Sequence, residues 1–113
     1  MPSALNLNAT TRAERHAITG KVSDAIQRSG GWIIDFRYFS NLSLCINFEI
    51  EARYVARMRA ELETLDLRFS DASRAAGAQW DNDVNSREIS GTLQITFIHR
   101  EPDLRREIPP IPG

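Results

Sequence analysis

The chain has 113 residues, of which 42% are hydrophobic and 26% charged, and its formal net charge is −1. This length and composition are typical of one globular domain and exclude a disordered chain, a membrane protein or a second sizeable core. The near-zero charge provides no global field that attracts nucleic acid or an anionic membrane, so we expect neither as a partner. No apolar run approaches the roughly 20 residues that cross a bilayer.

Two features predict a cytoplasmic location. The N-terminal residues 1–8 contain no basic region followed by an apolar one, so we expect no secretory signal. Cys45 is the single cysteine and can form no internal disulfide, which is typical of a protein from a reducing compartment.

The first predicted elements are a strand over residues 4–9 and a helix that ends at Gly30-Gly31. The spacing of Thr11 and Glu14 is that of a capping box, in which the threonine caps the helix and the glutamate reaches back. One helix face is apolar at helical spacing and is predicted to be buried: Ile18, Val22, Ala25 and Ile26.

Residues 32–39 and 42–50 alternate with period two and predict a hairpin. Because residues opposite each other share a face, Tyr38 pairs with Leu42 or Leu44, and a three-residue turn fits best. In the strand over residues 32–39, one face holds Trp32, Ile34, Phe36 and Tyr38. The other face holds Ile33, Asp35, Arg37 and Phe39.

The inward faces of these elements predict the core. Phe36, Ile46 and Val22 are expected to be buried together between the sheet and the helices. On that reading, truncating Phe36 to alanine costs on the order of 3–5 kcal/mol.

The second half of the chain predicts a helix over residues 51–65, a short strand over 67–69 and a last strand over 91–99. Residues 71–90 are expected to be largely irregular, with a brief alanine-rich helix over 71–80. We therefore predict a single domain over residues 1–100 and a proline-rich tail over 101–113.

These elements predict an α+β protein with a ferredoxin-like βαββαβ plait: an antiparallel sheet, two helices on one face and an extra C-terminal strand. Residues 5–69, with Gly-Gly before "WIIDFRY", "LSLCINFEI" running directly into a helix, and "LDLRF" after it, resemble an ACT domain in layout. ACT domains are ligand-sensing modules of amino-acid metabolic enzymes. The resemblance implies a regulatory module that binds a small effector such as an amino acid at a dimer interface.

Six polar residues are candidates for ligand binding: Thr10, Thr11, Arg12, Asp35, Arg37 and Asn47. The first three lie at the predicted N-terminus of the first helix, where free amides and the helix dipole favour an anion. The alternative is a helix capped by its own threonine with Arg12 in solvent. The other three lie on the outer face of the sheet, away from the helices.

The outer face is also the predicted interface of a homodimer, because apolar residues flank its charges: Ile33, Phe39, Cys45 and Ile98. The alternative is a solvated face with scattered hydrophobic residues. The third strand's outward residues include no aromatic platform for stacking bases, which argues against RNA binding.

No metal, cofactor or catalytic site is predicted. Residues 81–85 imitate the start of a calcium loop, but Ser86 and Thr92 occupy the positions of its glycine and closing glutamate. His16 and His99 have no ligand partners at metal-binding spacing.

The sequence therefore favours a non-enzymatic, ligand-sensing module that dimerises through its sheet. One alternative is a pure oligomerisation or protein-interaction module. Another is a small acylphosphatase-like enzyme using Arg12 and Asn41, although the glycine-rich phosphate cradle is absent.

Overall fold

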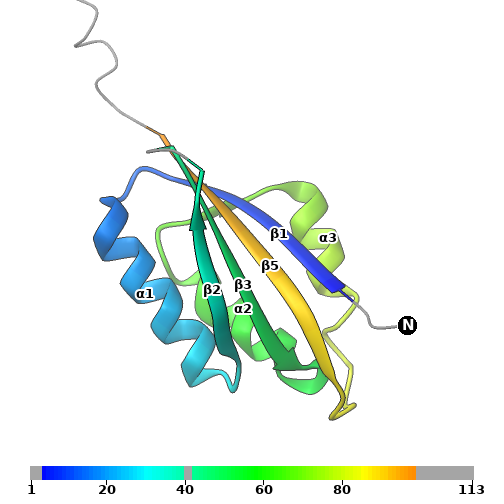
Figure 1. Ribbon diagram of the computed structural model, residues 1–113. Helices are drawn as coiled ribbons and strands as arrows, with labels where there is room; N and C mark the ends of the chain where they lie inside the picture. The colour runs from blue at the N-terminus through cyan, green and yellow to red at the C-terminus, as the bar shows by residue number, and fades with distance from the viewer. Residues whose placement is uncertain (1–3, 40–41, 99–113) are drawn as a thin grey trace, which may run out of the picture.

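A computed structural model describes residues 4–39 and 42–98 of the chain (Figure 1). The elements in chain order are β1 (Ala4–Thr11), α1 (Arg15–Arg28), β2 (Trp32–Tyr38), β3 (Ser43–Glu51), the 3-10 turn η1 (Ala52–Tyr54), α2 (Val55–Glu63), β4 (Arg68–Phe69), α3 (Asp71–Ala78) and β5 (Glu88–Phe97). The protein is α+β, as the sequence predicted. The tail over 101–113 lies outside the described residues.

The five strands form one sheet in the order β2-β3-β5-β1-β4. Three neighbouring pairs are antiparallel, but β1 and β5 are parallel, so the expectation of a purely antiparallel sheet is wrong. β4 runs back along β1, and α3 and the segment 79–87 follow it. These carry the chain to the end of the sheet where β1 starts, so the strand that follows must run in the direction of β1.

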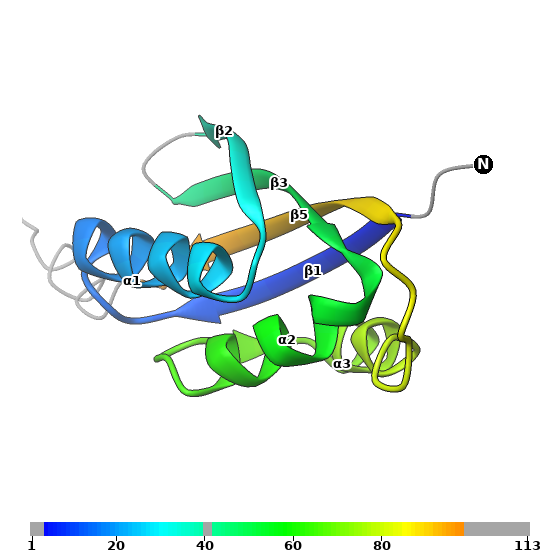
Figure 2. The same cartoon turned by 90° about the horizontal axis from the view of Figure 1, so that it is seen from below.

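The helices lie on one side of the sheet (Figure 2), and the buried hydrophobic side chains of both layers form one core. The predicted buried face of α1 is confirmed, and Val55, Met58 and Leu62 of α2 are buried against it. The sheet contributes alternate residues of β1, β3 and β5 to the same core, each at most 6% exposed. Burying one such large apolar side chain contributes roughly 1.5–3 kcal/mol, which makes this layer contact the main stabilising term.

A β-bulge in β2 changes which residues face the helices. The pairing with β3 shifts between Ile33 and Asp35, so that Ile33 lies opposite Phe48 on the inner side. Ile33 is therefore partly buried against the core, and its predicted place on the outer face is wrong. A single extra residue reverses the alternation of a strand, and no residue type in this segment announces it.

Phe36 faces the inner side, as predicted, but it is not part of the core. It lies opposite Ile46, which is fully buried, as is Val22, whereas Phe36 is 41% exposed. The reason is visible in Figure 2, where β2 curls away from the helical layer towards its end. An inward-facing residue on an edge strand is buried only as far as the helices extend beneath it.

The hairpin register is one of the two that the sequence allowed. Tyr38 pairs with Leu44, and the amide of Phe39 donates to the carbonyl of Ser43 at 2.9 Å. The turn residues 40–41 lie outside the described residues. Residues 71–78 form α3, capped by the hydroxyl of Ser70, so the brief helix predicted over 71–80 is confirmed, and β5 begins at Glu88, earlier than predicted.

Candidate functional site

A hollow of about 490 Å³ lies where β1 ends beside the loop that precedes β4. It holds three of the predicted ligand-binding residues and one predicted interface residue, Ile98. Its lining consists of Thr10, Thr11, Arg12, Leu65, Asp66, Leu67, Arg68 and Ile98.

Thr11 is the residue that joins the walls of this hollow. Its hydroxyl donates to the backbone carbonyl of Asp66 at 2.5 Å and accepts from the amide of Ala13 at 3.0 Å. Its carbonyl accepts from the amide of Ile98 at 2.8 Å. Because its hydroxyl proton is already committed and its side chain is buried, Thr11 shapes the hollow and is not a donor to a ligand.

The charged groups of the hollow are exposed and unmatched. Neither Arg12 nor Arg68 forms an ion pair with an acidic residue in the described part of the chain, and the same holds for the carboxylate of Asp66. The hollow therefore presents two guanidinium groups and one carboxylate to solvent, beside the apolar side chains of Leu65 and Leu67.

The N-terminus of α1 does not contribute an anion site. Glu14, not Thr11, is the N-cap, and its carboxylate oxygens accept from the amides of His16 and Ala17, both at 2.9 Å. These two backbone hydrogen bonds are the main cause that lowers the pKa of Glu14. The predicted threonine cap is wrong because Thr11 still belongs to β1 and is held by the loop before β4.

The other predicted ligand residues lie elsewhere, on the outer face of β2 and β3. The side-chain amide of Asn47 donates to Asp35 at 2.6 Å, and the hydroxyl of Thr92 donates to Asn47 at 3.2 Å. Arg37 lies 3.7 Å from Asp35. Two strands separate β3 from β4, so the six predicted residues form two separate clusters and not one site.

Of the four predicted interface residues, Ile33 faces the core and not the outer face. Phe39, just beyond β2, is 57% exposed, and Ile98, which lines the hollow, is 41% exposed. Cys45 does lie on the outer face, opposite Arg37. Partial burial and then the nearby carboxylate of Asp35 raise the pKa of the Cys45 thiol, so it is not an activated nucleophile.

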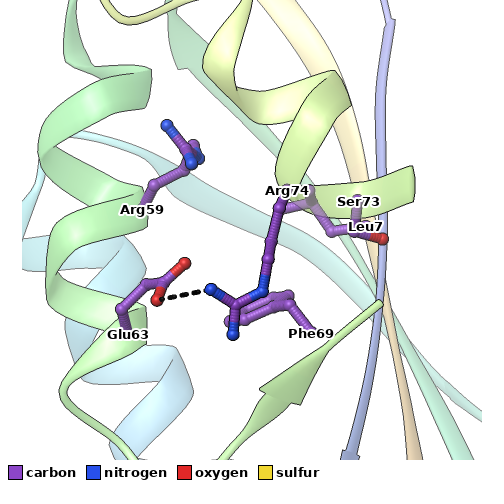
Figure 3. Close-up of a pocket in the computed structure, with 6 residues that line it drawn as sticks. All are labelled: Leu7, Arg59, Glu63, Phe69, Ser73 and Arg74. Carbon is purple, nitrogen blue, oxygen red and sulfur yellow. Dashed lines mark ion pairs between the residues drawn. The ribbon is translucent and has the colours of Figure 1, made fainter. Parts of the chain in front are cut away.

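A second, smaller cavity lies between α2, α3 and β1, and no sequence pattern predicted it. Figure 3 shows Arg74 extending beside Phe69 to Glu63, with 3.7 Å between the charged groups. Its volume is about 10 Å³, which suffices for no more than a water molecule. This cavity is a packing feature and not a ligand site.

The calcium-like loop has its oxygen atoms engaged within the chain. Asp81 pairs with Arg59, and Asp83 and Asn85 accept from the amides of Asn85 and Arg87. Among the residues described, no three His, Cys, Asp or Glu side chains gather as a metal site. His99 lies outside them.

Comparison with protein-family models, with curated proteins and with solved structures finds no match to this chain. Within residues 4–39 and 42–98, no helix is long and apolar enough to cross a membrane.

Proposed function

We propose that this protein is a non-enzymatic, ligand-sensing module that binds a small carboxylate-bearing metabolite, such as an amino acid, in the hollow beside β4. The observation that carries the proposal is the set of unmatched charges: Arg12 and Arg68 with no acidic partner among the described residues, and Asp66 between them in sequence. A guanidinium recognises a carboxylate with two parallel hydrogen bonds, and a carboxylate such as Asp66 is a natural acceptor for an ammonium group.

The size and lining of the hollow support the same class of ligand. Its volume of about 490 Å³ falls within the usual range of small-molecule sites. Leu65, Leu67 and Ile98 supply apolar surface for a side chain. Among the described residues that line it there is no histidine, cysteine or lysine, so Asp66 is the one conventional general base in that set. That composition favours binding over turnover.

The relation to ACT domains and to the ferredoxin-like plait belongs to the same proposal. It is supported by the order of elements from β1 to β4, and by the pairing of β4 with β1 at the edge opposite the β2–β3 hairpin. The likeness ends at β5, which lies between β3 and β1. The single cysteine favours a cytoplasmic location.

The test is a thermal-shift and calorimetric screen of the full chain against amino acids, simple carboxylates and dicarboxylates. A ligand at 100 times its dissociation constant adds about 2.7 kcal/mol to the free energy of unfolding. We expect Arg12→Gln and Arg68→Gln to abolish the effect, and Arg57→Gln, on the exposed surface of α2, to preserve it.

A third variant separates amino acids from plain carboxylates. Asp66→Asn should weaken only the ligands that carry an ammonium group. A screen without any saturable shift, or a shift that both arginine variants retain, contradicts the proposal. Acetyl phosphate serves as a control substrate, and its hydrolysis should stay at the uncatalysed rate; turnover that requires Arg12 would favour an acylphosphatase-like enzyme instead.

A further inference from the structure

Most of the large exposed hydrophobic side chains among the described residues lie at the β2 edge of the sheet. Eight large hydrophobic side chains are exposed in the described part of the chain, and six of them lie on β2 or its turn. Edge strands of natural proteins are normally short, charged or covered, because an exposed apolar edge can pair with a strand of another molecule. The six are Trp32 (52% exposed), Ile34 (53%), Phe36 (41%), Tyr38 (52%), Phe39 (57%) and Leu42 (49%).

The hydrogen-bonding phase of β2 leaves its edge ready to pair. The amide of Phe39 bonds to Ser43 on β3, and the direction of backbone groups alternates along an antiparallel strand. The amides and carbonyls of Arg37 and Asp35 therefore also point to β3, while those of Phe36 and Tyr38 point away from it. β2 is the outermost of the described strands, so these groups line a sheet edge that no other described strand pairs with.

The charges on β2 are self-complementary about Phe36. Asp35 and Arg37 flank it on the outer face, 3.7 Å apart and both substantially exposed. In a two-fold antiparallel pair centred on Asp35 or on Arg37, that residue meets its own copy and like charges face each other. When the strand pair is centred on Phe36, the Asp35 of each copy lies opposite the Arg37 of the other copy. Directly opposed unlike charges stabilise strand pairing, and like charges oppose it.

We propose that the protein forms a two-fold symmetric homodimer in which β2 pairs with β2 of a second copy, with Phe36 opposite Phe36. The outward-pointing amide and carbonyl of Phe36 then exchange hydrogen bonds with their symmetry mates. Tyr38 lies opposite Ile34, and the two Asp35–Arg37 pairs take the positions where side chains approach most closely. The pairing joins the two sheets into one and covers the apolar edge.

This interface is an edge and not the outer face that the sequence favoured. It lies at the β2 edge of the sheet, whereas the hollow lies at the opposite edge, beside β4. Dimerisation and ligand binding can therefore succeed or fail separately, and each has its own variants.

The test is a charge exchange followed by analytical ultracentrifugation at micromolar concentrations. The wild-type chain should sediment as a dimer. Asp35→Arg and Arg37→Asp should each sediment as monomers, because each places like charges opposite each other. An equimolar mixture of the two variants should recover a heterodimer, and the double variant D35R/R37D should recover the homodimer.

Two controls fix the location of the interface. Glu49→Arg reverses a charge on the outer face of the neighbouring strand and should leave the dimer intact. In a Cys45→Ser background, Phe36→Cys should form an intermolecular disulfide on mild oxidation, since Cα atoms of a hydrogen-bonded antiparallel pair lie about 5.5 Å apart. The helical circular-dichroism signal of each variant verifies that it has folded.

A monomeric wild-type chain overturns the proposal. A dimer that Glu49→Arg dissociates, or that survives both single reversals, also overturns it, because the contact would then lie elsewhere. Failure of Asp35→Arg to fold leaves Arg37→Asp, the double variant and the cross-link as independent measurements.

Discussion

The ring of Phe48 on β3 lies against the backbone of Gly91, its partner on β5. A methyl group at Gly91 would come within 2.3 Å of Cζ of Phe48. Both residues are buried, and Leu5 of β1 pairs with Gly91 on its other side. We predict that Gly91→Ala destabilises the fold by about 1–3 kcal/mol, the usual cost of overpacking, measured by urea unfolding.

Gly20 on the exposed side of α1 is the matched control. No atom lies within 4 Å of the position that a methyl group would take there. Since alanine is the better helix former, Gly20→Ala should stabilise the protein by about 0.5–1 kcal/mol. Opposite signs for the same chemical change at two glycines would confirm the packing of Phe48. A neutral Gly91→Ala would contradict it.

Ile46 and Phe36 face each other across β3 and β2 but should differ in their cost of truncation. Ile46 is fully buried, so Ile46→Ala should cost about 2–5 kcal/mol. Phe36→Ala should cost the monomer clearly less, because a substantial part of its ring is already in water. Both are measured by denaturant unfolding in the Arg37→Asp background, where the chain is expected to be monomeric. Equal losses would mean that helices cover β2.

Glu14 should make the stability of α1 depend on pH. Its pKa is lowered in the folded state by the amides of His16 and Ala17, so its contribution is present above the pKa of the unfolded chain. That contribution is lost as the pH falls through the lowered value. Glu14→Gln should therefore lower the melting temperature at neutral pH, and the difference from wild type should shrink on acidification.

The control is Asp24→Asn on the exposed side of α1, which removes a carboxylate that accepts no hydrogen bond from the described residues. It should lower the melting temperature less than Glu14→Gln does. A difference for Glu14→Gln that persists undiminished in acid would mean that its amide contacts do not depend on the charge.

The loop around Asp81 should not respond to calcium. Arg59 neutralises Asp81, and Asp83 and Asn85 are engaged with backbone amides. Millimolar calcium should therefore leave the melting temperature unchanged. A saturable rise that Asp81→Ala abolishes would contradict this assignment.

The sequence alone determined the strands and helices and most of their buried faces. Apolar spacing in α1 identified the buried residues Ile18, Val22, Ala25 and Ile26 correctly, because helical periodicity is a local property and the helix packs on one layer only. Parity, which is also local, limited the partner of Tyr38 to Leu42 or Leu44, and the structure has Leu44.

Only the tertiary structure decided the rest. β5 runs parallel to β1 because α3 and the segment after it bring the chain back to the end of the sheet where β1 starts. Ile33 faces the core because of a β-bulge that no residue type marks. Arg12 and Arg68 line the same hollow because the hydroxyl of Thr11 donates a hydrogen bond to the carbonyl of Asp66, 55 positions further along the chain. Such relationships arise when distant segments pack, and a periodicity read along one segment carries no information about them.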